Sequence, residues 1–129
     1  MSNPTAQPTL PLSTALVSRP GIMQQSLRAS LAACPGLEIV GAYGDGLTAL
    51  NHVVAQPPAL LVIDCNLLDE EVEALVAAVK TRQVTTRCLV FTRSHQRNAW
   101  ARASGADFVM PRDGSMQELM RVLTQLQEP

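Results

Sequence analysis

The feature that most constrains the fold is the alternation of short apolar runs with segments of helical periodicity. Short, nearly continuous apolar runs are typical of strands that are buried on both faces of a sheet. Five such runs occur, at 14–18, 37–42, 59–63, 87–91 and 107–110. Each intervening helix would carry the chain back over the sheet, so the pattern predicts a parallel α/β sheet covered on both faces.

Apolar residues spaced three and four apart predict a helix after each strand. These stripes lie within residues 23–34, 47–54, 72–79, 95–104 and 119–126. The stripe at 95–104 is polar and weakly patterned, so its ends are the least defined. Ser115 and Glu118 have the spacing of a capping box, which would satisfy free amides at the start of the last helix.

The length and composition indicate one folded domain. A chain of 129 residues with 47% hydrophobic and 16% charged residues can bury a core without disulfides, and its net charge of -1 does not favour nucleic acid. The first dozen residues hold three prolines, so we expect a flexible leader over 1–13 and a folded domain over 14–127. Neither a membrane span nor a signal peptide is indicated, and we expect a cytoplasmic protein.

The cysteines and histidines do not suggest a metal or catalytic site. Cys34, Cys65 and Cys88 lack metal-binding spacing and suit a reducing compartment, where they would act as small core residues. His52 and His95 have no nucleophile or metal-spaced partner nearby in the sequence, which favours ordinary surface or groove positions.

Ligands of such sheets bind beyond the carboxyl ends of the strands, so the residues there form the candidate site. Asp64 directs attention to this edge, because it ends the apolar run 59–63 and is followed by the acids 69–71. We expect these three acids to form the first turn of a helix and to complement its dipole.

Four segments in order resemble the receiver domain of bacterial two-component response regulators, over residues 14–126. They are "LVSRPGIMQQSLRASLAACPGLEIVGAYGDGLTAL", "LLVIDCNLLDEE", "CLVFTRS" and "SGADFVMPRDGSMQEL". The resemblance is to the subfamily usually joined to a helix-turn-helix output domain. It implies a flavodoxin-like, doubly wound, five-stranded parallel sheet of order 2-1-3-4-5 with five helices, and a signalling role without enzymatic activity.

The resemblance also implies roles for three residues. Asp64 matches the phosphoryl acceptor, and Thr92 matches the switch hydroxyl that bonds the phosphate. The backbone carbonyl of Asn66, together with Asp64, matches magnesium ligands.

Other positions depart from the family pattern. The acidic metal-binding pair falls on Val17 and Ser18, and the site lysine falls on Arg112. Magnesium usually needs one or two carboxylates beside the phosphate, and only one acid of three remains, so we expect weak or absent magnesium and no resident cofactor. Arg112, helped by Arg19, would instead supply a fixed positive charge and form an ion pair with Asp64. The sequence therefore predicts an atypical, degenerate receiver.

Three functions remain open from the sequence. The first is a receiver controlled by a sensor histidine kinase or another signalling protein, with a possible homodimer through the fourth helix, fifth strand and fifth helix. DNA would be reached only through a separate C-terminal output domain, and no membrane partner is expected. The second is a phosphorylation-independent pseudo-receiver that acts as an interaction or dimerisation module. The third is a flavin or other small-cofactor protein, which a 3% aromatic content disfavours.

Overall fold

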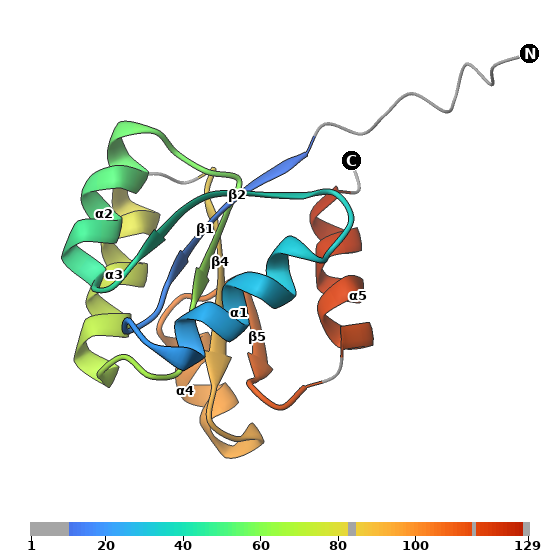
Figure 1. Ribbon diagram of the computed structural model, residues 1–129. Helices are drawn as coiled ribbons and strands as arrows, with labels where there is room; N and C mark the ends of the chain where they lie inside the picture. The colour runs from blue at the N-terminus through green and yellow to red at the C-terminus, as the bar shows by residue number, and fades with distance from the viewer. Residues whose placement is uncertain (1–10, 83–84, 115, 128–129) are drawn as a thin grey trace, which may run out of the picture.

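The computed structural model describes residues 11–82, 85–114 and 116–127. Strands and helices alternate along the chain, as predicted (Figure 1). The elements are β1 (Leu12–Val17), α1 (Ile22–Ala32), β2 (Leu37–Tyr43), α2 (Gly46–Ala55), β3 (Leu60–Ile63), α3 (Asp69–Arg82), β4 (Arg87–Thr92), the 3-10 helix η1 (His95–Arg97), α4 (Asn98–Ala103), β5 (Phe108–Pro111) and α5 (Met116–Gln127).

The five strands form one parallel sheet in the order β2-β1-β3-β4-β5, which confirms the predicted fold and strand order. The predicted strand ends are correct to within two residues. The largest difference is in β1, which begins at Leu12 because Leu12 pairs with Leu37 and its amide donates to Gly36 O at 2.7 Å. The predicted boundary between leader and domain at 13–14 therefore falls inside β1.

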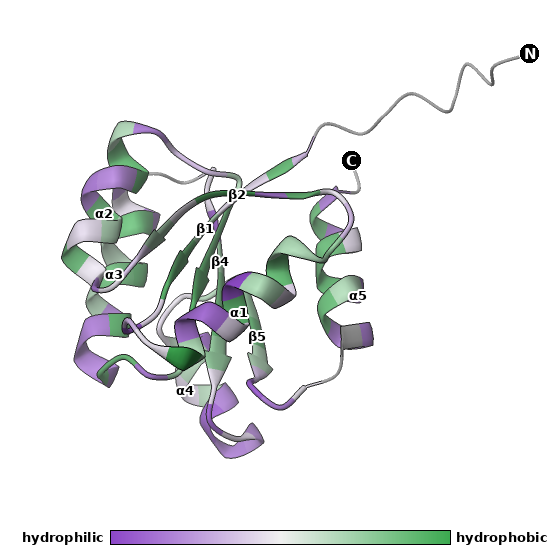
Figure 2. Cartoon of the chain, in the orientation of Figure 1, coloured by the Kyte–Doolittle hydropathy of each residue, from purple (hydrophilic) through white to green (hydrophobic). Residues whose placement is uncertain are grey.

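Helices cover both faces of the sheet and create two core layers (Figures 1 and 2). Alternate residues of each strand serve opposite layers. In β3, Leu61 and Ile63 pack with α2, α3 and α4, whereas Leu60 and Val62 pack with α1 and α5. All four side chains are fully buried, which explains why the run is apolar at every position.

The helices differ from the sequence prediction mainly around residues 95–104. This segment is divided into the short helix η1 and the six-residue α4, of which only Ala101 is fully buried. The acids Asp69, Glu70 and Glu71 form the first turn of α3, as predicted. The predicted cap Ser115 lies outside the described residues. None of the helices in the described part of the chain combines the length and hydropathy that a bilayer span requires.

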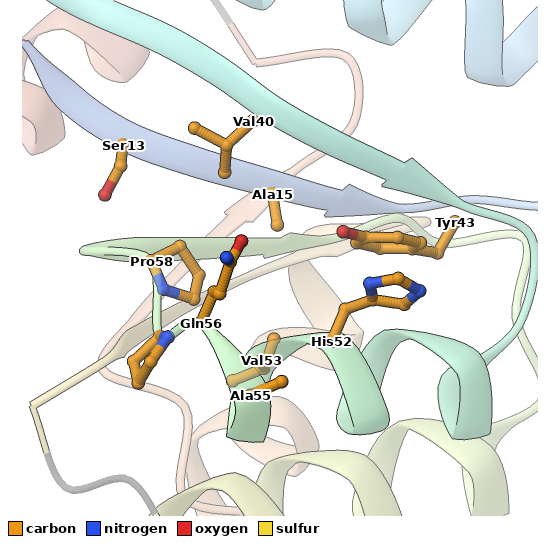
Figure 3. A pocket seen from close by; sticks show the side chains of 10 residues that line it. Ser13, Ala15, Val40, Tyr43, His52, Val53, Ala55, Gln56 and Pro58 are labelled. Carbon is orange, nitrogen blue, oxygen red and sulfur yellow. The ribbon is translucent and has the colours of Figure 1, made fainter.

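A cleft of about 420 Å³ opens between the edge of the sheet and the C-terminal half of α2 (Figure 3). Its walls include Ala15, Val40, Tyr43, His52, Val53 and Gln56, and we call it the α2–β2 cleft. It lies along the sheet, whereas the predicted site around Asp64 lies beyond the end of β3.

The buried layers predict how leucine-to-alanine substitutions change stability. Leu61→Ala, at a fully buried position, should lower the free energy of unfolding by about 2–5 kcal/mol because it leaves a cavity between β3 and the helices. Leu47→Ala, at a position that is 70% exposed on α2, is the matched control and should change it little. Urea denaturation of both variants measures the difference, and equal losses would contradict the layer assignment.

Candidate functional site

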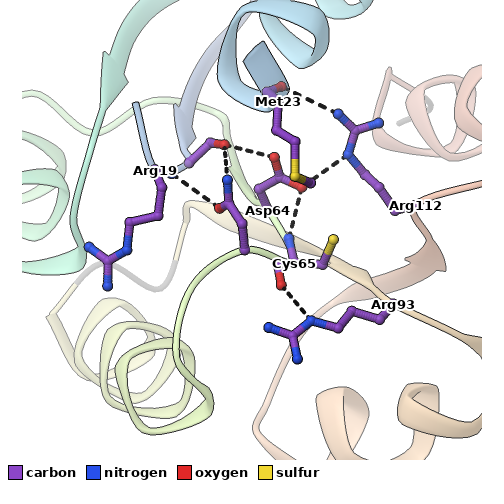
Figure 4. Close-up of polar contacts among 8 residues, drawn as sticks. Arg19, Met23, Asp64, Cys65, Arg93 and Arg112 are labelled. Carbon is purple, nitrogen blue, oxygen red and sulfur yellow. Dashed lines mark hydrogen bonds and ion pairs between the residues drawn. The ribbon is translucent and has the colours of Figure 1, made fainter. Parts of the chain in front are cut away.

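Asp64 lies at the carboxyl end of β3 with its carboxylate enclosed by hydrogen bonds (Figure 4). Its amide donates to Val17 O at 2.9 Å, which continues the pairing of β3 with β1. Oδ2 accepts from Ser18 Oγ at 2.7 Å, while Oδ1 accepts from the Cys65 amide at 2.8 Å and from Arg112 Nε at 3.0 Å. The residue has no exposed surface, so the protein alone satisfies this carboxylate.

Ser18 connects two loops at this edge of the sheet. Its hydroxyl donates to Asp64 and accepts from Asn66 Nδ2 at 3.1 Å, and Asn66 Oδ1 in turn accepts from the Arg19 amide at 3.1 Å. Gln24 Nε2 donates to Ser18 O at 2.6 Å and so fixes the start of α1. Sequence reasoning considered only the backbone carbonyl of Asn66 and missed its side chain.

Val17, the other position of the expected acidic pair, is a core residue. It is fully buried in the layer with α2 and α3. Its side chain therefore adds no ligand to the site, in contrast to Ser18.

Arg112 supplies the positive charge. Besides its ion pair with Asp64, its Nη2 donates to Met23 O at 3.4 Å, and its guanidinium carbon lies 5.6 Å from the centre of the Phe91 ring. Its side chain is 26% exposed, so this charge is only partly in water. The predicted ion pair between Arg112 and Asp64 is thus present.

The hydroxyl of Thr92 is not part of this hydrogen-bond network. Its Oγ1 lies 2.6 Å from Asn98 Oδ1 and 3.0 Å from Ser94 O, and thereby fastens the start of α4 to β4. The Thr92 carbonyl does accept from the Arg112 amide at 2.7 Å. The structure therefore joins Ser18, Asp64 and Arg112 through side chains, and Thr92 only through its backbone.

Arg19 does not assist Arg112, so that part of the prediction is wrong. Its guanidinium pairs with Glu71 and donates to Gly44 O at 3.2 Å. Glu71 Oε2 also accepts from the Gly46 amide at 2.7 Å, so it holds together the loops after β1 and β2. A carboxylate at the start of α3 therefore provides a partner that the sequence prediction did not consider.

These residues do not fit a divalent cation. In the described ranges, three or more Asp, Glu, His or Cys side chains nowhere gather into a possible metal site. Magnesium prefers oxygen ligands and keeps several waters. At Asp64 both carboxylate oxygens accept hydrogen bonds, and a guanidinium nitrogen lies 3.0 Å away.

Cys34 and Cys88 are buried in the two core layers and fit the predicted role of small core residues. Cys65 is only half-buried and belongs to neither layer, so the prediction does not hold for it. Burial raises the pKa of Cys88 to about 11. Burial, followed by the charge of Asp64, raises the pKa of Cys65 above its usual value.

Comparisons with known proteins identify the fold. Neither a protein-family model nor a curated protein sequence matches the chain. Among solved structures, a LuxR-family two-component response regulator from Aurantimonas has a TM-score of 0.79 and 21% identity, with 91% of this chain and 85% of that chain covered. The response regulator domain of Thermotoga maritima CheB has a TM-score of 0.76 and 16% identity, with 92% and 99% covered.

A further neighbour is RcsB from Salmonella enterica serovar Typhimurium bound to promoter DNA, with a TM-score of 0.77 and 16% identity. The match covers 92% of this chain but only 61% of the RcsB chain. The chain thus has the receiver-domain fold of response regulators, as predicted from the sequence.

The enclosed carboxylate predicts a strong effect of removing its cation. Arg112→Ala should lower the free energy of unfolding by roughly 2–4 kcal/mol, because Asp64 would remain buried without its charged partner. The double variant Asp64→Asn with Arg112→Ala should recover much of this loss, since the buried charge is gone. Chemical denaturation of the single and double variants gives the coupling.

Arg93→Ala is the control for this cycle, because Arg93 is exposed and donates to Cys65 O at 3.2 Å without pairing to Asp64. It should cost far less than Arg112→Ala. A double variant that is as unstable as the sum of its single variants would contradict the ion pair.

Cys65 can report the charge of Asp64. The pKa of Cys65 is raised first by burial and then by the neighbouring carboxylate, so Asp64→Asn should increase its thiolate fraction. We expect Cys65 to react faster with iodoacetamide in Asp64→Asn than in the unmodified protein at a pH of about 8. Peptide mass spectrometry identifies the alkylated residue, and buried Cys88 is the internal control. An unchanged rate would mean that Asp64 does not act on the thiol electrostatically.

Proposed function

We propose that this chain is a receiver-fold signalling module in which Asp64 is a permanent internal ion pair. Information then passes through a protein interaction surface and not through phosphorylation of Asp64. The observation that carries the proposal is the closure of the carboxylate: Asp64 is fully buried, and Ser18, Cys65 and Arg112 occupy both of its oxygens.

Phosphorylation of Asp64 would require one carboxylate oxygen to reach the phosphorus atom of a donor. Oδ2 accepts one hydrogen bond, from Ser18, and keeps a further lone pair, but Asp64 has no exposed surface, so the surrounding loops would have to open first. Opening would break or weaken the hydrogen bonds from Ser18 or Arg112, and hydrogen bonds to charged groups contribute roughly 1.5–3 kcal/mol each. The closed arrangement therefore raises the barrier to attack.

Charge compensation also differs from that expected of a phosphorylated receiver. Transfer of a phosphoryl group to a carboxylate brings two anions together, and the family pattern uses a metal ion and a lysine against this repulsion. Here Val17 and Ser18 add no charge, and Arg112 is already paired with Asp64. The site is neutralised in the resting protein, which favours one stable state.

The contacts of α4 support a surface that is fixed independently of Asp64. Arg97 forms an ion pair with Asp69, and its guanidinium lies 4.5 Å from the centre of the Trp100 ring. Trp100 Nε1 donates to Glu73 Oε1 at 3.3 Å. These contacts attach η1 and α4 to α3 and hold one edge of the surface made by α4, β5 and α5.

The interaction partner that we propose is a sensor histidine kinase or another signalling protein in the cytoplasm, or a second copy of this chain through α4, β5 and α5. The module itself is not an enzyme in this proposal. The RcsB chain solved on promoter DNA is longer than this chain, which covers 61% of it. By analogy, contact with DNA would come from a separate output domain.

A second candidate function is phosphoryl acceptance at Asp64 by an atypical route. It is favoured by Arg112, whose guanidinium has nitrogens beyond Nε that can bind a phosphoryl oxygen, and by Ser18, which can donate a hydrogen bond. The receiver domain of Salmonella RcsB was solved in the presence of the phosphomimetic BeF3-. The two candidates differ in their response to a phosphodonor.

The proposal predicts that small phosphodonors do not modify the protein or change its structure. Incubation of the protein with acetyl phosphate and magnesium should give no stoichiometric mass gain, because Asp64 is enclosed and the described residues form no cluster of metal-binding side chains. Hydrogen exchange of α4 and the sedimentation coefficient should also remain unchanged with or without BeF3-. Intact-protein mass spectrometry and analytical ultracentrifugation measure these outcomes.

Asp64→Asn is the matched control for this experiment. Rapid stoichiometric modification that is lost in Asp64→Asn would establish the second candidate and overturn the first. Ser18→Asp combined with Arg112→Lys restores the charges of the family pattern at two positions. If the closed site is what prevents reaction, this double variant should acquire magnesium-dependent mass gain.

A further inference from the structure

The α2–β2 cleft has the features of a small-molecule site. We propose that it binds an uncharged, flat heteroaromatic compound of one or two rings. The site is separate from Asp64, and the inference does not depend on the proposed function. Its volume of about 420 Å³ lies within the range of roughly 300–1,000 Å³ found for small-molecule sites.

The shape of the cleft favours a flat body. Ala15 and Val40 face it from the sheet, while Val53 and Pro58 face it from α2 and the segment that follows (Figure 3). The space therefore lies between two apolar layers, one of strand side chains and one of helix side chains. Val40 is 48% exposed, so burial under a ligand would remove apolar surface from water.

The aromatic wall of the cleft is formed by two stacked rings. The Tyr43 ring lies so close over Gly41 that a Cβ atom at Gly41 would be 2.2 Å from the Tyr43 hydroxyl oxygen. The ring also stacks on His52, with 4.7 Å between ring centroids and an angle of 19° between the planes. Glycine at position 41 thus permits the ring orientation, and the Tyr43 hydroxyl lies at the cleft (Figure 3).

Polar groups with unused hydrogen-bonding capacity converge on the same space. Within the described residues, the Tyr43 hydroxyl, the His52 ring nitrogens and the Gln56 carboxamide make no hydrogen bond. The Ser13 hydroxyl accepts from the Ala59 amide at 2.9 Å and keeps its proton for donation. Donors and acceptors are both present, which suits the edge of a nitrogen- and oxygen-bearing ring.

The lining carries no permanent charge, which disfavours an ionic ligand. The described residues that line the cleft include no Asp, Glu, Lys or Arg. A phosphate, carboxylate or ammonium group would therefore be desolvated without a permanent opposite charge to offset the cost. Apolar layers with a neutral polar edge leave an uncharged heteroaromatic compound as the class that fits.

NMR titration tests the inference with defined probes. The ¹⁵N-labelled protein is titrated with caffeine, quinoxaline and adenine, each followed up to about 10 mM, which corresponds to weak fragment affinity. At least one compound should give saturable shifts centred on the amides of Val40, Tyr43, His52 and Gln56. Sodium benzoate, an anionic ring of similar size, should give none there.

Matched substitutions on α2 separate the cleft from general surface binding. Ala55 lines the cleft and is exposed, so Ala55→Trp should fill the space and weaken binding at least about tenfold. Val54, the preceding residue, is 37% exposed and does not belong to the lining, so Val54→Trp should bind as the unmodified protein does. Gln56→Leu should weaken binding about tenfold through the lost hydrogen bonds.

The outcomes that overturn the inference are distinct. They are the absence of saturable shifts with all three probes, shifts centred outside the cleft, or equal binding by the unmodified protein and Ala55→Trp. If Ala55→Trp does not fold, Val40→Trp fills the cleft from an exposed strand position and replaces it in the comparison. Binding of benzoate at the cleft would contradict the neutral ligand class.

Discussion

The side chains at the carboxyl end of this sheet are arranged around one carboxylate that is buried out of water. Asp64 has no exposed surface, and a buried charge without a partner costs several kcal/mol. The strand order places β1 beside β3 but leaves β5 two strands away, on the far side of β4. Ser18 can therefore reach Asp64 as a neighbour, whereas Arg112 must cross β4, at a strand spacing of about 4.8 Å, over the ring of Phe91. This strand order therefore requires a long cationic side chain at position 112 to span β4 and reach Asp64.

The fold could be predicted because each strand is marked by an apolar run in its own sequence. The residues of β3 are apolar at every position since both faces of the sheet are covered, and the sequence shows this directly. The strand order came from the resemblance to receiver domains, because alternation of strands and helices alone permits several orders. The segment 95–104 was the weakest prediction for a physical reason: few of its residues enter the core, so little periodicity marks the boundary between η1 and α4.

The site was predictable only in part. The three residues that meet through side chains each follow, by two positions, a residue of the core layer with α1 and α5: Leu16, Val62 and Met110. Side chains alternate along a strand, so Ser18, Asp64 and Arg112 share one face, while Thr92 follows Val90 of the other layer and turns toward α4. This period of two was available in the sequence. The partner of Arg19 could not be predicted from the sequence, because loop conformations decide which carboxylate a flexible guanidinium reaches.

Under the proposed function, a guanidinium takes the place that a metal ion has in the family pattern, and this changes how the site could receive a signal. A magnesium ion exchanges with solvent, and its occupancy varies with concentration, whereas a covalently attached cation is always present. Under the proposed function, the charge at Asp64 is therefore constant, and any input must act on the surrounding loops. The Ser18 amide donates to Tyr43 O at 3.0 Å, and the side chain of Tyr43 lines the α2–β2 cleft. One backbone hydrogen bond thus links Tyr43 of the cleft to Ser18, whose hydroxyl donates to Asp64.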